Sequence, residues 1–257
     1  MIAMNAPSRG IPALALLTVV TSGLAACGRI PGQFEIVNDQ VPMSGSCVIG
    51  VDETVYQGQG TLDLTLVRQG AQSAYFVFPL LKNNLDASSS GGDANQIFLS
   101  SFAIDLTPLG QLPMGSESAF TGANDPGSAD YALFHYQTPW SGSIPSGGSK
   151  ISAIVPSFPV ALAEKILSTQ AIGPAPALWV NAKLRAFGST ANQNMESDPF
   201  TFPISICAGC LVANVLPCPY TVAPTFLGNP CNPAQDDPID CCQSGSDLVC
   251  PPPVVKQ

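Results

Sequence analysis

The cysteines are the residues of this 257-residue chain whose spacing points most directly to chemistry. Cys207 and Cys210 form a C-x-x-C pair, and two intervening residues suit one half of a tetrahedral zinc site. Cys218 and Cys231 could supply the remaining thiolates. However, no second C-x-x-C follows, and the single histidine, His135, lies far upstream. The spacing therefore favours disulfide bonds, and we expect no metal.

A C-x-x-C pair can also act as a redox-active dithiol. In a thioredoxin-type site the pair opens a helix directly after a strand, within a β-α-β pattern. Here Cys207 ends an alternating apolar stretch and leads into a segment rich in proline. This context favours structural disulfides that stabilise a segment of weak periodicity.

Carboxylates gather near the C-terminal end of the chain. Asp236, Asp237, Asp240 and Asp247 lie close together in sequence, and calcium needs six to eight oxygen ligands in a shaped loop. The spacing of an EF-hand loop is absent from this segment. We therefore interpret it as a solvated acidic loop.

Motifs of nucleophilic catalysis are absent from the sequence. It contains no G-x-S-x-G, no S-x-x-K and no H-E-x-x-H. His135 stands in the aromatic stretch "LFHYQ", where a packed ring is the ordinary role of a histidine. We expect a protein that is not an enzyme and that needs no cofactor. One alternative stays open, an envelope hydrolase whose carboxylates meet only in space, with a site built from loops such as residues 110–130.

The first residues of the chain indicate where in the cell the protein is located. Arg9 precedes an apolar run, residues 11–24, which is too short for a membrane-spanning helix of about 20 residues. A basic start, a short apolar middle and small residues before a cut are typical of a secretory signal peptide. The run ends in Leu24-Ala25-Ala26-Cys27, which resembles the lipobox of bacterial lipoproteins. The alternative is an ordinary signal peptide with a cysteine near its cleavage site.

The resemblance covers only residues 1–28, and it implies an anchor. In bacterial lipoproteins the cysteine thiol receives a diacylglyceryl group, and the signal is cut before that cysteine. One acyl chain binds a membrane only marginally and stable anchoring takes two, so an acylated Cys27 would hold the chain to membrane lipid. Gly28 follows the cysteine where an aspartate would retain a lipoprotein at the inner membrane. The resemblance therefore implies export, with the outer membrane favoured over the inner membrane.

Composition limits the class of fold and partner. The residues after position 26 carry 8 Lys and Arg against 18 Asp and Glu, a formal charge of −10, which argues against nucleic acid and anionic lipid as partners. Only 11% of the chain is charged and 46% is hydrophobic, which is not the profile of a disordered acidic tail. With 23 glycines and 25 prolines, the chain is typical of an all-β domain with many turns.

Alternation of apolar and polar residues predicts the strands. Leu62, Leu64 and Leu66 share one face of residues 61–68, with Asp63 and Thr65 on the other. The turn "QGAQ" and the apolar run 73–81 complete a predicted hairpin. Further strands are expected at 96–106, 131–137, 149–158, 177–188 and 199–207, with loops at 83–95, 110–130 and 141–149. In 177–188, Val180, Ala182, Leu184 and Ala186 share one face, opposite Trp179, Asn181, Lys183 and Arg185. One short helix is expected at 159–168, with Ser157 as its cap.

These elements predict an all-β fold, an antiparallel β-sandwich of the immunoglobulin-like or jelly-roll-like kind. A closed barrel is the alternative. The predicted organisation is a signal peptide at 1–26, a lipidated cysteine and tether at 27–44, the sandwich at 45–206 and a cysteine- and proline-rich extension at 207–257.

The number of cysteines constrains their pairing. Nine is odd, which is awkward in an oxidising compartment, but lipidation of Cys27 leaves eight that can all pair. Seven of these lie in the extension, so Cys47 must bond to the extension, with Cys207 or Cys210 as the expected partner. Cys241 and Cys242 should bond to different partners, because adjacent residues of an extended chain point apart. The disulfide candidates are Cys47, Cys207, Cys210, Cys218, Cys231, Cys241, Cys242 and Cys250.

The extension also resembles small knotted disulfide peptides in the order of its cysteines. Cys218, Cys231, Cys241-Cys242 and Cys250 follow the order C…C…CC…C, with longer spacings and without a final cysteine. The expected role of the whole chain is structural, interaction or ligand binding at the cell envelope, with another envelope or surface protein or a glycan as partner. A cysteine-rich inhibitor module on a sandwich stalk is a further alternative.

The anchor is testable. The substitution Cys27→Ser should leave the chain unacylated and release it from the membrane fraction, whereas Cys47→Ser, a matched loss of a thiol outside the lipobox, should leave it membrane-bound. Fractionation and mass spectrometry of the N-terminal peptide measure both effects. An unmodified Cys27 in the wild type, or a mature chain that starts elsewhere, would contradict the assignment.

Overall fold

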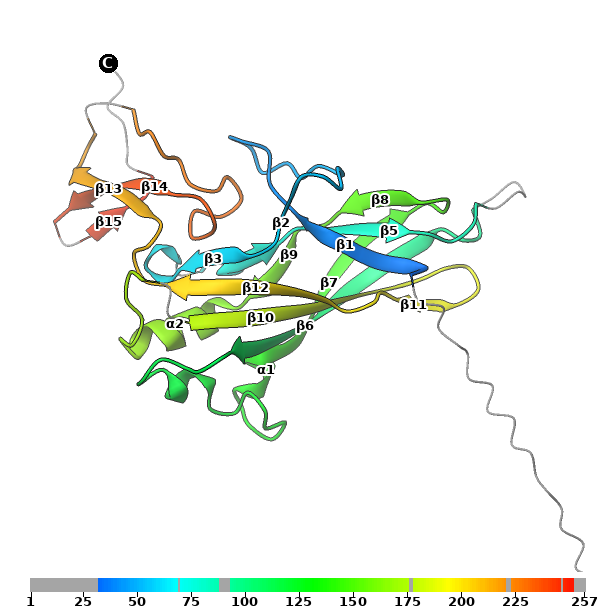
Figure 1. The fold of residues 1–257 in the computed structure, drawn as a ribbon, viewed down its shortest axis with the longest axis horizontal. Helices are drawn as coiled ribbons and strands as arrows, with labels where there is room; N and C mark the ends of the chain where they lie inside the picture. The colour runs from blue at the N-terminus through cyan, green and yellow to red at the C-terminus, as the bar shows by residue number, and fades with distance from the viewer. Residues whose placement is uncertain are drawn as a thin grey trace, which may run out of the picture. The chain divides into compact units, whose positions relative to one another are not determined.

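A computed structural model describes residues 32–251, except 69, 88–92, 176–177, 221–222 and 246 (Figure 1). The proposed signal peptide and Cys27 lie outside the described residues. Within the described part of the chain, no helix combines the length and apolar character that a membrane span requires.

The described residues form an all-β structure in which two large sheets share one core (Figure 1). One sheet has the order β3 (Gly60–Asp63), β12 (Phe200–Cys207), β10 (Leu178–Ser189), β6 (Ile97–Leu109) and β7 (His135–Ile144), with β11 (Asn194–Glu196) paired to β10. The other has the order β2 (Tyr56–Gln57), β1 (Phe34–Gln40), β5 (Pro79–Asn83) and β8 (Ser149–Ser152). Both sheets contribute side chains to a single buried cluster. The predicted β-sandwich is therefore confirmed, and the closed barrel is wrong because both sheets have open edges.

Strand β10 is the centre of the larger sheet. It pairs antiparallel with β6 on one side and with β12 on the other. Val180, Ala182 and Leu184 are fully buried and alternate with more exposed neighbours, as the sequence pattern predicts. Pairing is antiparallel throughout this sandwich except between β12 and β3, which run parallel.

The predicted hairpin between residues 61–68 and 73–81 is wrong. Strand β3 ends at Asp63, and Leu64–Leu66 form a 3-10 turn, η1, because the Asp63 carboxylate accepts a hydrogen bond from the Thr65 N–H at 3.0 Å and so turns the chain. Thr65 is exposed as expected, but Asp63 is fully buried rather than outward-facing. The apolar run divides into β4 (Tyr75–Val77), which pairs with β9 (Val155–Phe158), and β5, which pairs with β1 and β8.

Three other expectations need correction. Residues 131–134 form a short helix, α1 (Tyr131–Phe134), before β7 begins at His135 and continues to Ile144 within the predicted loop 141–149. The predicted helix exists as α2 (Val160–Ser168), but Pro159 occupies the N-cap position, and the Ser157 hydroxyl bonds to the Val155 carbonyl at 2.8 Å instead. Residues 34–40 lie within the predicted tether, in which the stretch "FEIV" indicates the start of a strand. They form β1 and pair with β5, so the tether is shorter than predicted.

The C-terminal extension packs on the sandwich. It contains a small sheet of β13 (Val212–Pro217), β14 (Ile239–Ser244) and β15 (Asp247–Val249), drawn in orange and red in Figure 1. Ala234, Ile239 and Cys241 are buried in the same hydrophobic cluster as the sandwich core. The extension therefore contributes to the main core.

Leu64 tests the core. Its side chain is only 2% exposed, so Leu64→Ala should lower the free energy of unfolding by about 2–5 kcal/mol through lost burial and a residual cavity. Met114 is 92% exposed, and Met114→Ala should change little. Thermal and urea unfolding of both variants make the comparison; an unchanged stability of Leu64→Ala would show that the chain does not pack as described.

Candidate functional site

The eight cysteines after Cys27 are all paired. The structure contains the disulfides Cys47–Cys231, Cys207–Cys210, Cys218–Cys242 and Cys241–Cys250. Cys47 bonds to the extension, as the count requires, and the adjacent cysteines have different partners. Cys231, not Cys207 or Cys210, is the partner of Cys47, because the extension folds back along β3, where Asp236 N–H donates to the Thr61 carbonyl at 2.9 Å.

Asp63, Cys207 and Cys210 form the one group of three metal-ligand side chains within the described residues. Their ligand atoms lie within 4.8 Å of one another, but the two sulfurs are bonded to each other. The Asp63 carboxylate also accepts hydrogen bonds from Gly209 N–H at 2.7 Å and Leu211 N–H at 2.9 Å, in addition to those from Thr65. Its lone pairs are therefore used to hold the C-x-x-C loop, and the group acts as a structural anchor.

The His135 side chain makes structural hydrogen bonds through both ring nitrogens. Nδ1 lies 2.8 Å from Asp105 Oδ1, and Nε2 lies 2.8 Å from the Ala123 carbonyl oxygen. The ring of Tyr131 stacks on the imidazole at a centroid distance of 4.2 Å. Because both ring nitrogens are engaged, His135 joins loop 110–130 to strand β6.

The acidic residues of the extension have separate partners. Asp240 accepts hydrogen bonds from Asn214 Nδ2 at 2.6 Å and from the Thr225 and Phe226 N–H groups. Asp236 is directed into the sandwich, where Tyr75 donates to it at 2.7 Å. These carboxylates fix the path of the chain and do not converge on one point.

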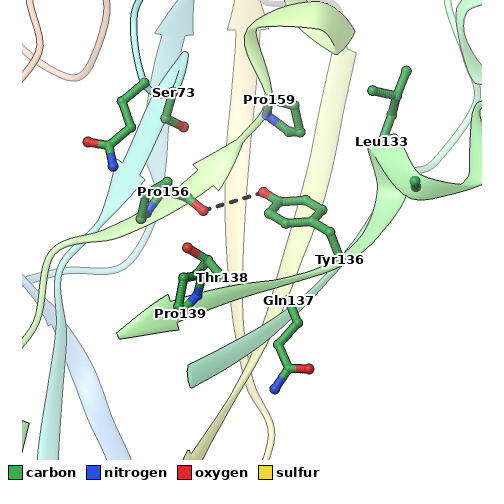
Figure 2. Close-up of a pocket in the computed structure, with 10 residues that line it drawn as sticks. Ser73, Leu133, Tyr136, Gln137, Thr138, Pro139, Pro156 and Pro159 are labelled. Carbon is green, nitrogen blue, oxygen red and sulfur yellow. Dashed lines mark hydrogen bonds between the residues drawn. The ribbon is translucent and has the colours of Figure 1, made fainter. Parts of the chain in front are cut away.

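A pocket of about 360 Å³ opens between β7, β9 and α1 (Figure 2). Strand β7 supplies four consecutive lining residues, β9 and the turn after it supply two prolines, and the rest come from α1 and the approach to β4. The lining residues are Gln72, Ser73, Ala132, Leu133, Tyr136, Gln137, Thr138, Pro139, Pro156 and Pro159. None of them carries a charge, so the pocket suits an uncharged ligand.

Prolines shape this pocket by interrupting strand edges. Strand β7 is the outer strand of the larger sheet, and Pro139 lies within it. Pro156 lies within β9, which pairs only with β4. Since proline lacks an N–H donor, it discourages a ladder between two such edges. The Tyr136 hydroxyl crosses the gap and donates to the Pro156 carbonyl at 3.4 Å (Figure 2).

The pocket has no activated nucleophile. Burial raises the pKa of the Tyr136 hydroxyl above its ordinary value, so this group stays a neutral phenol. Ser73 Oγ lies 2.7 Å from the Tyr75 carbonyl and 2.8 Å from the Phe158 carbonyl, so its hydroxyl proton is held by the backbone. Among the described residues, the raised carboxyl pKa values belong to Asp39, Asp236 and Asp237, none of which lines the pocket. The lining therefore offers neutral hydrogen-bonding groups and apolar surface to a ligand.

Comparison with known proteins found no relative: no protein family, curated protein or solved structure matches this chain.

The sequence patterns did not reveal the pocket, because its residues come from four segments. The signal that could have found it is the occurrence of Pro139, Pro156 and Pro159 in or beside predicted strands, next to Tyr136. Prolines at these positions mark edges that cannot pair fully.

Proposed function

We propose that this protein is an exported, lipid-anchored binding protein of the cell envelope that holds an uncharged glycan in the pocket between β7 and β9. The lipobox at Leu24–Cys27 supports the anchor, and the residues that follow supply the short tether to β1. The observation that carries the binding role is the uncharged, chemically inert lining around Tyr136. The outer membrane is the proposed location because Gly28 follows Cys27.

The lining has the chemistry that a neutral sugar requires. Gln72 carries an amide that can both donate and accept hydrogen bonds, and Thr138 adds a hydroxyl. The Gln137 amide nitrogen is already used in a hydrogen bond to Ser101 Oγ. Tyr136 and the prolines provide apolar surface for the C–H face of a sugar ring. The formal charge of −10 after position 26 disfavours anionic polymers by long-range repulsion. A neutral glycan fits this lining and this charge better than an acidic polymer or a lipid headgroup does.

The proposal predicts a specific loss of binding. Neutral oligosaccharides from the envelope, titrated against the mature chain in calorimetry or by NMR, should bind with one site per chain. The change Gln72→Ala removes an exposed amide from the lining and should weaken binding about tenfold, the loss of one or two hydrogen bonds. Gln111→Ala makes the same chemical change at an exposed position outside the pocket and should leave the affinity unchanged.

Two results would count against this function. One is an absence of binding across a panel of neutral oligosaccharides. The other is binding that Gln72→Ala and Gln111→Ala affect equally, which would place the ligand elsewhere. Turnover of an oligosaccharide during the titration would instead favour the hydrolase alternative.

A further inference from the structure

Two carboxylates lie together where the extension meets the sandwich. Asp39 is on β1 and is fully buried, and Asp236 is on the extension. Gln57 Nε2 donates to Asp39 Oδ2 at 2.8 Å and lies 3.4 Å from Asp236 Oδ2, so one amide bridges the pair. The Tyr75 hydroxyl donates to Asp236 Oδ1 at 2.7 Å. The cluster therefore joins β1, β2, β4 and the extension.

Around this cluster the extension docks through backbone groups. Gln235 bonds to both backbone groups of Phe76, accepting from its N–H at 2.9 Å and donating to its carbonyl at 3.1 Å. Thr61 N–H donates to Asp236 Oδ1 at 2.9 Å, and Asp63 N–H donates to the Ala234 carbonyl at 2.8 Å. Residues 232–236 thus lie along β3 and β4 as an added edge.

Strand β3 and the Tyr75 ring can approach each other closely because Gly60 has no side chain. A Cβ at this position would lie 1.9 Å from the Tyr75 hydroxyl oxygen, so any larger residue would displace the phenol from Asp236. Tyr75 is itself fully buried. The docked segment therefore depends on a tightly packed polar contact.

The electrostatics of the pair are unfavourable when both groups are ionised. Among the described residues, the titratable groups that face one another here are Asp39, Asp236 and Tyr75, without a cationic partner. Burial, assisted by the charge of Asp236, raises the pKa of Asp39 to about 8. Burial also raises the pKa of Asp236 and that of Tyr75, which stays a neutral donor. At neutral pH the cluster therefore retains a proton that exposed carboxyl groups would lose.

We propose that Asp39 and Asp236 form a proton-operated latch, in which the proton held by the pair keeps residues 232–236 docked on the sandwich and its loss releases them. The Cys47–Cys231 disulfide joins the start of this segment to the loop after β1, so the released segment stays attached to the chain. Release uncovers the backbone groups of Phe76 and the edge of β3. The latch thus exposes a strand edge in alkaline conditions and covers it in acid.

The sign of the pH dependence follows from linkage. In the open state water reaches Asp39, and its pKa returns toward the ordinary value of 3.8, whereas in the docked state it is about 8. Between these values the docked state binds more protons than the open state, so docking weakens as pH rises. The opening constant should rise by about tenfold per pH unit between about pH 5 and 7 and level off above the docked pKa.

Hydrogen exchange of the mature, oxidised protein measures this constant. The amide protons of Thr61, Asp63 and Asp236 report on the docked segment, because each bonds across the contact. After correction for the intrinsic exchange rate at each pH, their protection should fall steeply from pH 5 to 7. The Val180 and Ala182 amides of β10 serve as an internal reference, and their protection should change little.

The variant Asp39→Asn tests whether protonation of Asp39 controls docking. An amide has the shape of the protonated carboxyl, and Gln57 can turn its own amide to accept from it. This variant should therefore stay docked at pH 9 and lose the pH dependence, while Asp86→Asn, at an exposed position, should behave as the wild type.

The outcomes decide the proposal. Protection of Thr61, Asp63 and Asp236 that is independent of pH in the wild type would overturn it, as would a full pH dependence in a folded Asp39→Asn variant. If Asp39→Asn fails to fold, Asp236→Asn takes its place, with a reduced slope expected and an unchanged slope contradicting the latch. Binding of glycan is not required for any of these measurements.

Discussion

The structure depends on how strand β3 is held. This strand spans only Gly60–Asp63 and has one strand neighbour, β12, in the larger sheet. Its other edge would offer unpaired backbone groups to solvent or to another chain. Residues of the extension occupy that edge: the Ala234 carbonyl accepts from Asp63 N–H, and Asp236 N–H donates to the Thr61 carbonyl. The extension thus completes the sandwich.

Three kinds of interaction meet at this edge and support one another. The Cys47–Cys231 disulfide closes a loop with a sequence separation of 184, which restricts the unfolded chain. The Asp63 carboxylate holds the C-x-x-C loop through the N–H groups of Gly209 and Leu211. The Asp39–Asp236 pair adds a contact whose strength depends on a proton. The covalent bond keeps the segment near the sandwich, and the carboxylates determine how it docks.

The sequence predicted correctly those features of the fold that depend on the alternation of residues or on their number. Alternation along β10 gave the buried face of Val180, Ala182 and Leu184 correctly, because a strand between two others must bury one whole side. The odd number of cysteines likewise required Cys47 to pair with the extension. In contrast, Asp63 was assigned to the exposed face by alternation, although its carboxylate turns the chain locally at Thr65 and binds N–H groups distant in sequence. No periodic pattern carries such long-range polar contacts.

The same limit applies to the sites. The pocket around Tyr136 brings together segments that pair with different strands, so it becomes visible only once the sheets are placed. The predicted partner of Cys47 was wrong because the extension returns along β3 and so brings Cys231 to Cys47. Alternation of apolar and polar residues does not describe this path. Cysteine counting restricts the possible pairings, whereas the fold selects among them.

The most direct test of this account is the stability of a mature chain that ends after Cys210, with Cys47→Ser to avoid a free thiol. Its reference is the full-length Cys47→Ser/Cys231→Ser variant, which lacks the same disulfide but keeps the extension. If the extension completes the sandwich, thermal unfolding should show a cooperative transition for the reference and a strongly lowered or absent transition for the truncated chain. Equal midpoints for the two chains would contradict the account, because β3 would then be stable without the segment that covers it.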